Sequence, residues 1–185
     1  MEPGGGAVVR LATWRVPRAS RPDDTAHKTE AVLGDAAESL FARLPTVYRE
    51  SLQNLPTVVR RLEKHADALR GRRDELEGAL AEAGSTRSHV EGTVRDGSAA
   101  ESLRAHSDAA RAALTAAHDA AGARLADVIA ALEALRLGLL RLRAGAATPA
   151  DLTSDLELAS QVGQQVDALL HGVQQAGIAT ARGEP

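Results

Sequence analysis

Apolar residues recur at alternating steps of three and four along much of the chain, the spacing that places them on one face of an α-helix. The clearest stripe consists of Leu125, Val128, Leu132, Leu135, Leu139 and Leu142. Ile129, Leu137 and Leu140 widen it, which is typical of a helix with more than one neighbour. We therefore predict a long helix over residues 98–144, with an alanine-rich first half.

Two further stripes follow the same rule. The first predicts a helix over 56–83 and consists of Leu55, Val59, Leu62, Ala66, Leu69, Arg73, Leu76, Leu80 and Ala83. The second predicts a helix over 149–175 and consists of Leu152, Leu156, Ala159, Gly163, Val166, Leu170 and Val173. Because a buried charge is costly, we expect Arg73 either to reach solvent or to lie in a hydrated layer. The mixed charges between the stripe positions, Arg70 among them, indicate a solvated face.

Breaks in these stripes set the remaining boundaries. A helix over 25–44 is interrupted by Pro45, and a short helix over 45–53 follows. The motif Leu-Pro-Thr-Val occurs at 44–47 and again at 55–58, with proline in the first turn each time. We expect Gly84 to end the 56–83 helix and residues 85–97 to form a loop or a weak continuation. Thr148, Pro149 and Asp151 form a helix start, with threonine as the N-cap.

These elements predict an all-α fold of long antiparallel helices, arranged as a coiled-coil hairpin or an elongated helical bundle. We expect one helical region at 25–175, a disordered basic tail at 1–24 and a frayed tail at 176–185. The C-terminal helix can fold back on the leucine-rich stripe of 125–142. Self-association along that stripe is the alternative.

Composition supports this fold and narrows the chemistry. The chain has 185 residues, of which 44% are hydrophobic and 2% aromatic, so its core depends on leucine, valine and alanine. It has no cysteine, which excludes disulfides, thiolate metal sites and thiol catalysis. A net charge of −3 and the scarcity of aromatic residues speak against nucleic-acid binding. We expect a cytoplasmic protein, since no run of apolar residues is long enough to span a bilayer.

The sequence offers no catalytic, cofactor-binding or metal-binding residues that we would assign. The glycines at 92 and 97 have the spacing of a phosphate-binding loop but lack its lysine. The six histidines include no pair at the spacing of a helical zinc site. His118 continues the 125–142 stripe backwards and could sense pH, but we favour a partly exposed side chain with one hydrogen bond. We therefore expect a protein that is not an enzyme.

The segment at 10–21 combines four arginines with apolar residues and Trp14. Such a segment can contact a membrane surface, but we favour a disordered tail.

Several stretches resemble a known family. They are Thr29–Gly34, Ala36–Phe41, Leu44-Pro45 and Leu55–Glu63, with Arg10–Trp14 before them and Asp151–Leu156 and Val166–Leu170 after them. Together they resemble the C-terminal helical region of bacterial Hanks-type serine/threonine protein kinases. The glycine-rich loop, His-Arg-Asp and Asp-Phe-Gly motifs of the kinase domain are absent from this sequence, so the resemblance carries over no catalytic residue.

We therefore expect a non-catalytic helical module for interaction or oligomerisation, resembling a detached kinase C-terminal region. The alternatives are a regulatory segment that acts on a kinase in trans and a peripheral membrane protein. The expected partner is another protein or a second copy. The packing seam that would carry the interaction consists of Leu55, Val59, Leu62, Leu69, Leu76, Leu80, Leu125, Val128, Leu132, Leu135, Leu139, Leu142, Leu152, Leu156, Val166 and Leu170.

Overall fold

The computed structural model describes residues 23–90 and 98–181, with side chains described for residues 29–85 and 101–172. Within these residues the chain forms five helices and no strand, which confirms the all-α prediction. The helices are α1 (Asp23–Ala42), α2 (Thr46–Ser51), α3 (Leu55–Val90), α4 (Ser98–Arg143) and α5 (Pro149–Ala181). The expectations for the basic tail, the 91–97 loop and the last four residues lie outside the described part.

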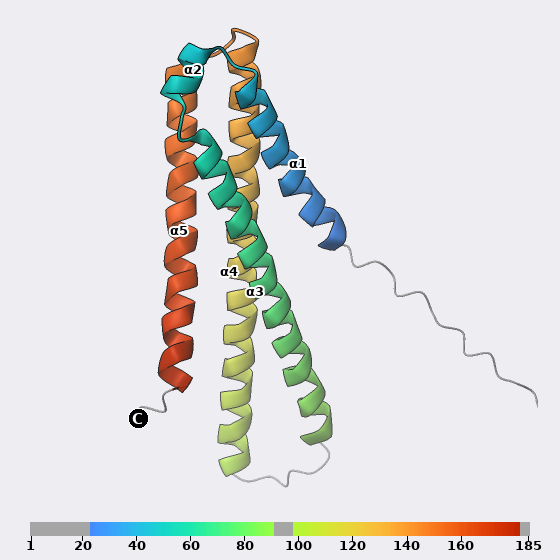
Figure 1. Ribbon diagram of the computed structural model, residues 1–185. Helices are drawn as coiled ribbons and strands as arrows, with labels where there is room; N and C mark the ends of the chain where they lie inside the picture. Colours follow the sequence, from blue (N-terminus) through green and yellow to red (C-terminus); the bar gives the residue numbers. More distant parts are fainter. Residues whose placement is uncertain (1–22, 91–97, 182–185) are drawn as a thin grey trace, which may run out of the picture.

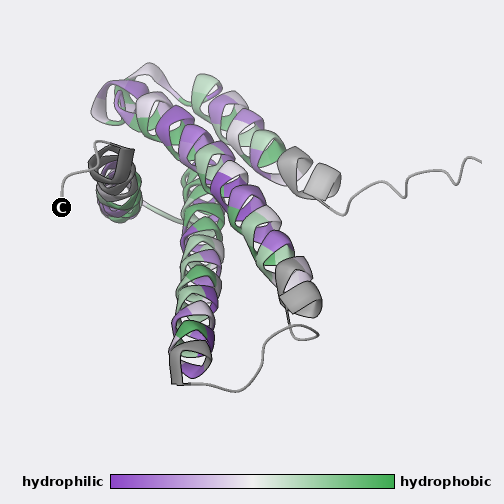
Figure 2. Ribbon diagram, turned by 90° about the horizontal axis from the view of Figure 1, so that it is seen from below, coloured by the Kyte–Doolittle hydropathy of each residue, from purple (hydrophilic) through white to green (hydrophobic). Residues whose placement is uncertain are grey.

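The long helices form an elongated bundle around α3 and α4 (Figure 1). Helix α4 has 46 residues and is therefore about 69 Å long. It packs against α1, α3 and α5, while α3 also packs against α1 and α5. Helices α1 and α5 lie on opposite sides of the α3–α4 pair in both ribbon views (Figures 1 and 2). No described helix is both long and apolar enough to cross a membrane.

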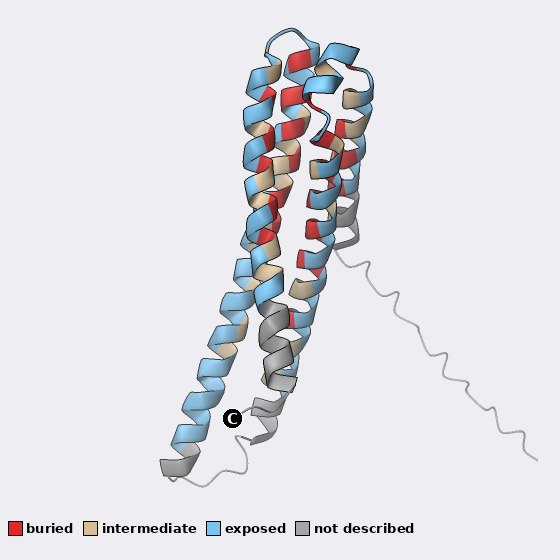
Figure 3. Cartoon of the chain, turned by 60° about the vertical axis from the view of Figure 1, so that its left-hand side comes forward, coloured by how far each residue is buried: buried red, intermediate tan, exposed pale blue. Residues whose placement is uncertain are grey.

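The core lies where all four long helices overlap. Buried residues gather in the upper part of the bundle, whereas the lower part of α4 is exposed along most of its surface (Figure 3). Hydrophobic residues run along α4, and hydrophilic residues dominate the visible surface of α3 (Figure 2). Leucine supplies most of the large buried side chains, since the chain has few aromatic residues to fill the core.

The start of α5 follows the predicted local signal. Thr148 Oγ1 donates to Asp151 Oδ2 over 2.8 Å, and the Thr148 backbone N–H donates to the same oxygen over 2.8 Å. These two hydrogen bonds hold the pKa of the Asp151 carboxyl below its usual value, and the one from the backbone has the larger effect. The predicted cap of α5 is therefore confirmed.

Two helices end later than predicted, and for residues 85–90 the alternative of a helical continuation is the one observed. Helix α3 continues through Gly84 to Val90, and α5 continues past residue 175 to Ala181. Among the described glycines only Gly145 has a positive φ, at 71°, so Gly84 does not adopt the left-handed conformation of a helix stop. A glycine inside a helix costs about 1 kcal/mol relative to alanine, and the strong helix formers Ala81, Glu82 and Ala83 directly before Gly84 offset that cost.

Candidate interaction surfaces

The predicted packing seam lies inside the chain's own bundle. On α4, the stripe from Leu125 to Leu142 is between 0 and 6% exposed. The seam residues of α3 and α5 are buried as well, except Leu80 and Leu170, which are partly exposed. A partner can reach this seam only if the bundle opens, so the interaction role of the seam stays a prediction.

Leu52 belongs to the core but to none of the predicted stripes. It follows α2, and only 1% of its surface is exposed. Because α2 is short, it shows no repeat from which sequence analysis could have placed this residue. The Leu-Pro motifs on either side of α2 were the available signal that Leu52 is buried, since they fold the chain back over the end of the bundle.

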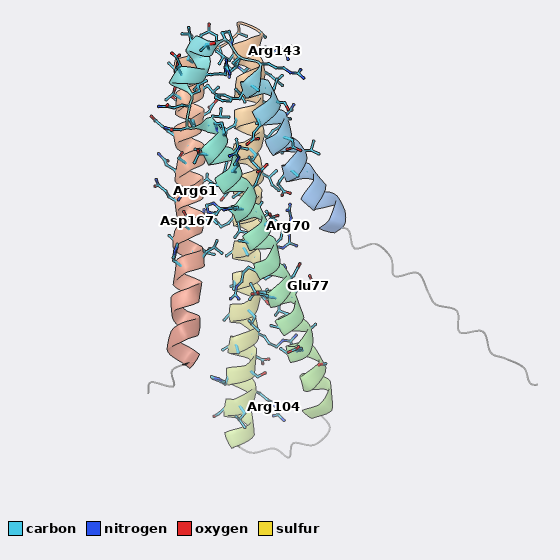
Figure 4. The ribbon with its side chains drawn as sticks, in the orientation of Figure 1. Arg61, Arg70, Glu77, Arg104, Arg143 and Asp167 are labelled. Carbon is cyan, nitrogen blue, oxygen red and sulfur yellow. The ribbon has the colours of Figure 1, made fainter. Side chains whose placement is uncertain are left out.

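A polar cluster joins α3 to α5. Arg61 forms an ion pair with Asp167, and His65 Nε2 lies 2.7 Å from Asp167 Oδ1 (Figure 4). The hydrogen bond from the Arg61 guanidinium has the largest effect on the Asp167 carboxyl and lowers its pKa. The hydrogen bond with His65 lowers this pKa further, although partial burial of the carboxyl acts in the opposite direction. Gly163 lets the helices come close, since a Cβ there would lie 3.6 Å from both Arg61 Nε and His65 Cε1.

The histidine of this cluster is enclosed. His65 is 6% exposed, and its Nδ1 is buried without a hydrogen-bond partner. Its Nε2 is already occupied by Asp167. With Nδ1 buried and Nε2 in contact with Asp167, the cluster joins α3 to α5.

A buried ion pair joins α1 to α3. Arg70 pairs with Glu30, and the two residues are 5% and 3% exposed. The assignment of Arg70 to a solvated face was therefore wrong, because its exposure depends on where α1 packs. Arg73, the charged residue in the seam, keeps partial exposure while its stem passes Gly122, where a Cβ would lie 3.9 Å from Arg73 Cδ.

Carboxylates gather at the upper α1–α3 contact. Glu63 lies against Gly34, where an added Cβ would overlap its carboxylate. Burial raises the pKa of the Glu63 carboxyl, and the nearby carboxylates of Glu38, Asp35 and Asp67 add to that rise. Arg60 Nε donates to Glu38 over 3.0 Å and offsets part of the negative charge.

The described residues hold no group of three or more side chains suited to a metal ion. His118 is partly exposed, with its side chain 28% accessible, and its Nδ1 lies 3.2 Å from the carboxylate of Asp119. It therefore matches the favoured expectation of a partly exposed side chain with one hydrogen bond.

An apolar groove runs along the outer contact of α4 and α5. It measures ≈ 400 Å³, and alanines form most of its floor: Ala130, Ala131 and Ala134 from α4, and Ala159 from α5. Leu158 and Val162 line its α5 side, and 61% of the Leu158 surface is exposed. Asp127 and Asp155 also line the groove. We call this feature the α4–α5 groove.

A second exposed surface lies at the other end of the molecule. We call residues 71–85 of α3 and 101–120 of α4 the projecting hairpin, because the two helices extend past α1, and their last turns extend past α5 as well (Figure 1). Within 101–120, only Arg111, Leu114 and His118 are partly shielded, and every other residue is exposed. Arg111, Leu114 and His118 are spaced by three and four residues, which places them on the side of α4 that faces α3. Leu103 is 70% exposed.

No protein-family model, curated protein or solved structure matches this chain. Functional inference therefore starts from these two exposed surfaces.

Proposed function

We propose that the chain is a non-catalytic helical interaction module that self-associates through the projecting hairpin. The observation that carries the proposal is the change in burial along α4. Its second half is enclosed by three other helices, whereas residues 101–120 of the same helix contain no buried residue.

The shape of the hairpin favours a second copy as the partner. Where α3 and α4 are fully covered, two further helices pack against them. The projecting hairpin lies beyond α1, and residues 101–120 of α4 remain uncovered there, so the hairpin of a second copy would supply two further helices. Such an arrangement is a four-helix bundle with a two-fold axis, the commonest symmetry of homo-oligomers.

The side chains of the hairpin suit close helix packing. The exposed surface of α4 there contains Leu103 and a series of small apolar residues: Ala105, Ala109, Ala110, Ala112, Ala113, Ala116, Ala117 and Ala120. Contiguous exposed apolar surface marks interaction sites on folded proteins. Because each alanine buries little area, the association should be modest in strength and depend on concentration.

Light scattering after size exclusion, over a range of concentrations, tests the proposal. We expect the mass to rise from one copy to two as concentration increases. Leu103→Glu should abolish that rise, because it replaces the largest exposed apolar side chain of this surface with a charge. Val47→Glu is the matched control, since Val47 is 71% exposed but lies on α2 at the opposite end. A single-copy mass at every concentration would refute self-association.

The resemblance to kinase C-terminal regions supports a second candidate, regulation of a kinase in trans. The chain would then bind a Hanks-type kinase and change its activity or accept its phosphate. Kinase assays with and without this chain test it, and unchanged activity together with no phosphotransfer and no binding would rule it out.

A further inference from the structure

Positive charge gathers at the upper end of the bundle. Helices α1 and α4 end there, and α2 and the α4–α5 connection lie there as well (Figure 1). We call residues 43–54 and 141–151 the basic end. They contain two carboxylates, Glu50 and Asp151, and four exposed arginines: Arg43, Arg49, Arg141 and Arg143. This end is therefore positive, although the whole chain has a net charge of −3.

The arginines of the basic end differ from most others in their partners. Elsewhere in the described chain, six arginines pair with a carboxylate: Arg60, Arg61, Arg70, Arg72, Arg124 and Arg136. None of the four arginines of the basic end forms an ion pair with a described residue. Asp151 accepts two hydrogen bonds from Thr148, and these lower its pKa more than the nearby charge of Arg141 does. The other three arginines thus keep their charge available to an anionic partner.

The basic end also exposes apolar side chains. Val47 on α2 is 71% exposed. Pro45 before α2 is exposed as well, as are Ala144 and Ala146 in the α4–α5 connection. Helix dipoles favour cations at the ends of α1 and α4, but they do not explain an exposed valine on the same surface. Cations together with exposed apolar side chains are typical of surfaces that contact anionic lipid.

We propose that the basic end binds an anionic lipid surface. The arginines contact the lipid phosphates, while Val47 and the two alanines enter the interface. A lipid surface suits this end better than an acidic protein does, because it requires cations at one end of the molecule but no complementary groove. Helix α4 then points away from the lipid, and the projecting hairpin at its far end stays free to pair (Figure 1).

Co-sedimentation of the full chain with vesicles tests the proposal. We expect binding to vesicles of equimolar phosphatidylcholine and phosphatidylserine to be many-fold stronger than binding to vesicles of phosphatidylcholine alone. Raising the salt concentration should remove most of this difference, because salt screens exposed charges. Arg43→Gln/Arg143→Gln should weaken binding to the anionic vesicles by roughly 25-fold, since each basic residue near such a surface contributes about fivefold.

Two further variants make the test specific. Lys64→Gln/Arg111→Gln removes the same charge from the middle of α3 and from the projecting hairpin, and should leave binding unchanged. Val47→Ser should weaken binding several-fold at constant charge. Far-UV circular dichroism checks that each variant is folded.

Equal binding to the two kinds of vesicle would overturn the proposal, as would anionic binding that Arg43→Gln/Arg143→Gln leaves intact. Equal losses in the two double variants would also overturn it, because net charge alone would then explain the binding. Binding to polyglutamate without binding to anionic vesicles would overturn it too, and would assign the basic end to an acidic protein.

Discussion

Helix α4 lies in two different environments, and the comparison shows what determines burial in this chain. From Leu125 to Leu142 its inward stripe carries large side chains, and they are between 0 and 6% exposed. From 101 to 120 the same helix is alanine-rich, with Leu114 partly shielded and Leu103 exposed. Helix propensity is high in both halves, so the difference lies in side-chain size and in the number of neighbouring helices.

The bundle should therefore be stabilised mainly by packing, and the projecting hairpin, in which Leu76 is the one buried side chain, mainly by local helix preference. Each buried methylene contributes about 0.8 kcal/mol, which favours the leucine stripe over the alanine surface. Four predictions test this comparison, from the largest expected effect to the smallest.

Loss of the buried ion pair should have the largest effect. Arg70→Ala leaves Glu30 buried without its cation, and we expect a loss of about 3–5 kcal/mol in the free energy of unfolding. Urea denaturation measures it. The double variant Glu30→Gln/Arg70→Ala should recover part of the loss, because no unpaired charge remains. If the double variant is less stable than Arg70→Ala, the ion-pair assignment is wrong.

Core truncation compares the two regions directly. Leu132→Ala removes a fully buried side chain and should cost about 2–5 kcal/mol. Leu80→Ala, at a partly exposed seam position in the hairpin, should cost clearly less. Thermal unfolding of both variants gives the comparison. Equal losses would show that the hairpin is packed as tightly as the bundle.

These two residues also show how far the sequence predicts the structure. The alternation of three and four predicted the helices and their inward faces, because that spacing is a property of one helix. It placed Leu80 and Leu132 in equivalent seams, although the hairpin lacks the neighbours that bury Leu132. The number of neighbours depends on tertiary packing, as does the burial of Arg70 beneath α1.

The α4–α5 groove shows the same limit. Ala130 and Ala134 belong to α4 and Leu158 to α5, and no local pattern indicates that residues of two different helices line one surface. The N-cap at Thr148, by contrast, depends on residues only three positions apart, and the sequence was sufficient to predict it.

The cap of α5 should have an intermediate effect. Thr148→Ala removes the hydroxyl that hydrogen-bonds Asp151, and we expect a loss of about 1 kcal/mol. Urea denaturation measures it, with Thr115→Ala on the exposed surface of the hairpin as the control. A loss at Thr148 no larger than that at Thr115 would show that the cap contributes nothing.

The smallest effect concerns the carboxylate cluster at the α1–α3 contact. Because the pKa of Glu63 is raised in the folded chain, its ionised form destabilises the fold above that folded pKa. The penalty disappears below the unfolded value of 4.5, where the carboxyl is protonated in both states. Glu63→Gln should therefore stabilise the fold at pH 7, by less than about 1 kcal/mol, and have little effect at acid pH.

Unfolding curves at several pH values measure this effect. Glu157→Gln, on the exposed surface of α5, is the matched control. Stabilisation by Glu63→Gln that is equal at neutral and acid pH would contradict the electrostatic explanation.

Hydrogen exchange measured by mass spectrometry at low and high protein concentration tests the central claim most directly. The account predicts that amides at 125–142 are strongly protected at both concentrations. Amides at 101–114 should exchange faster in dilute solution and gain protection as hairpins of two copies pair. Equal protection of the two halves in dilute solution, or no gain at 101–114 with concentration, would contradict the account.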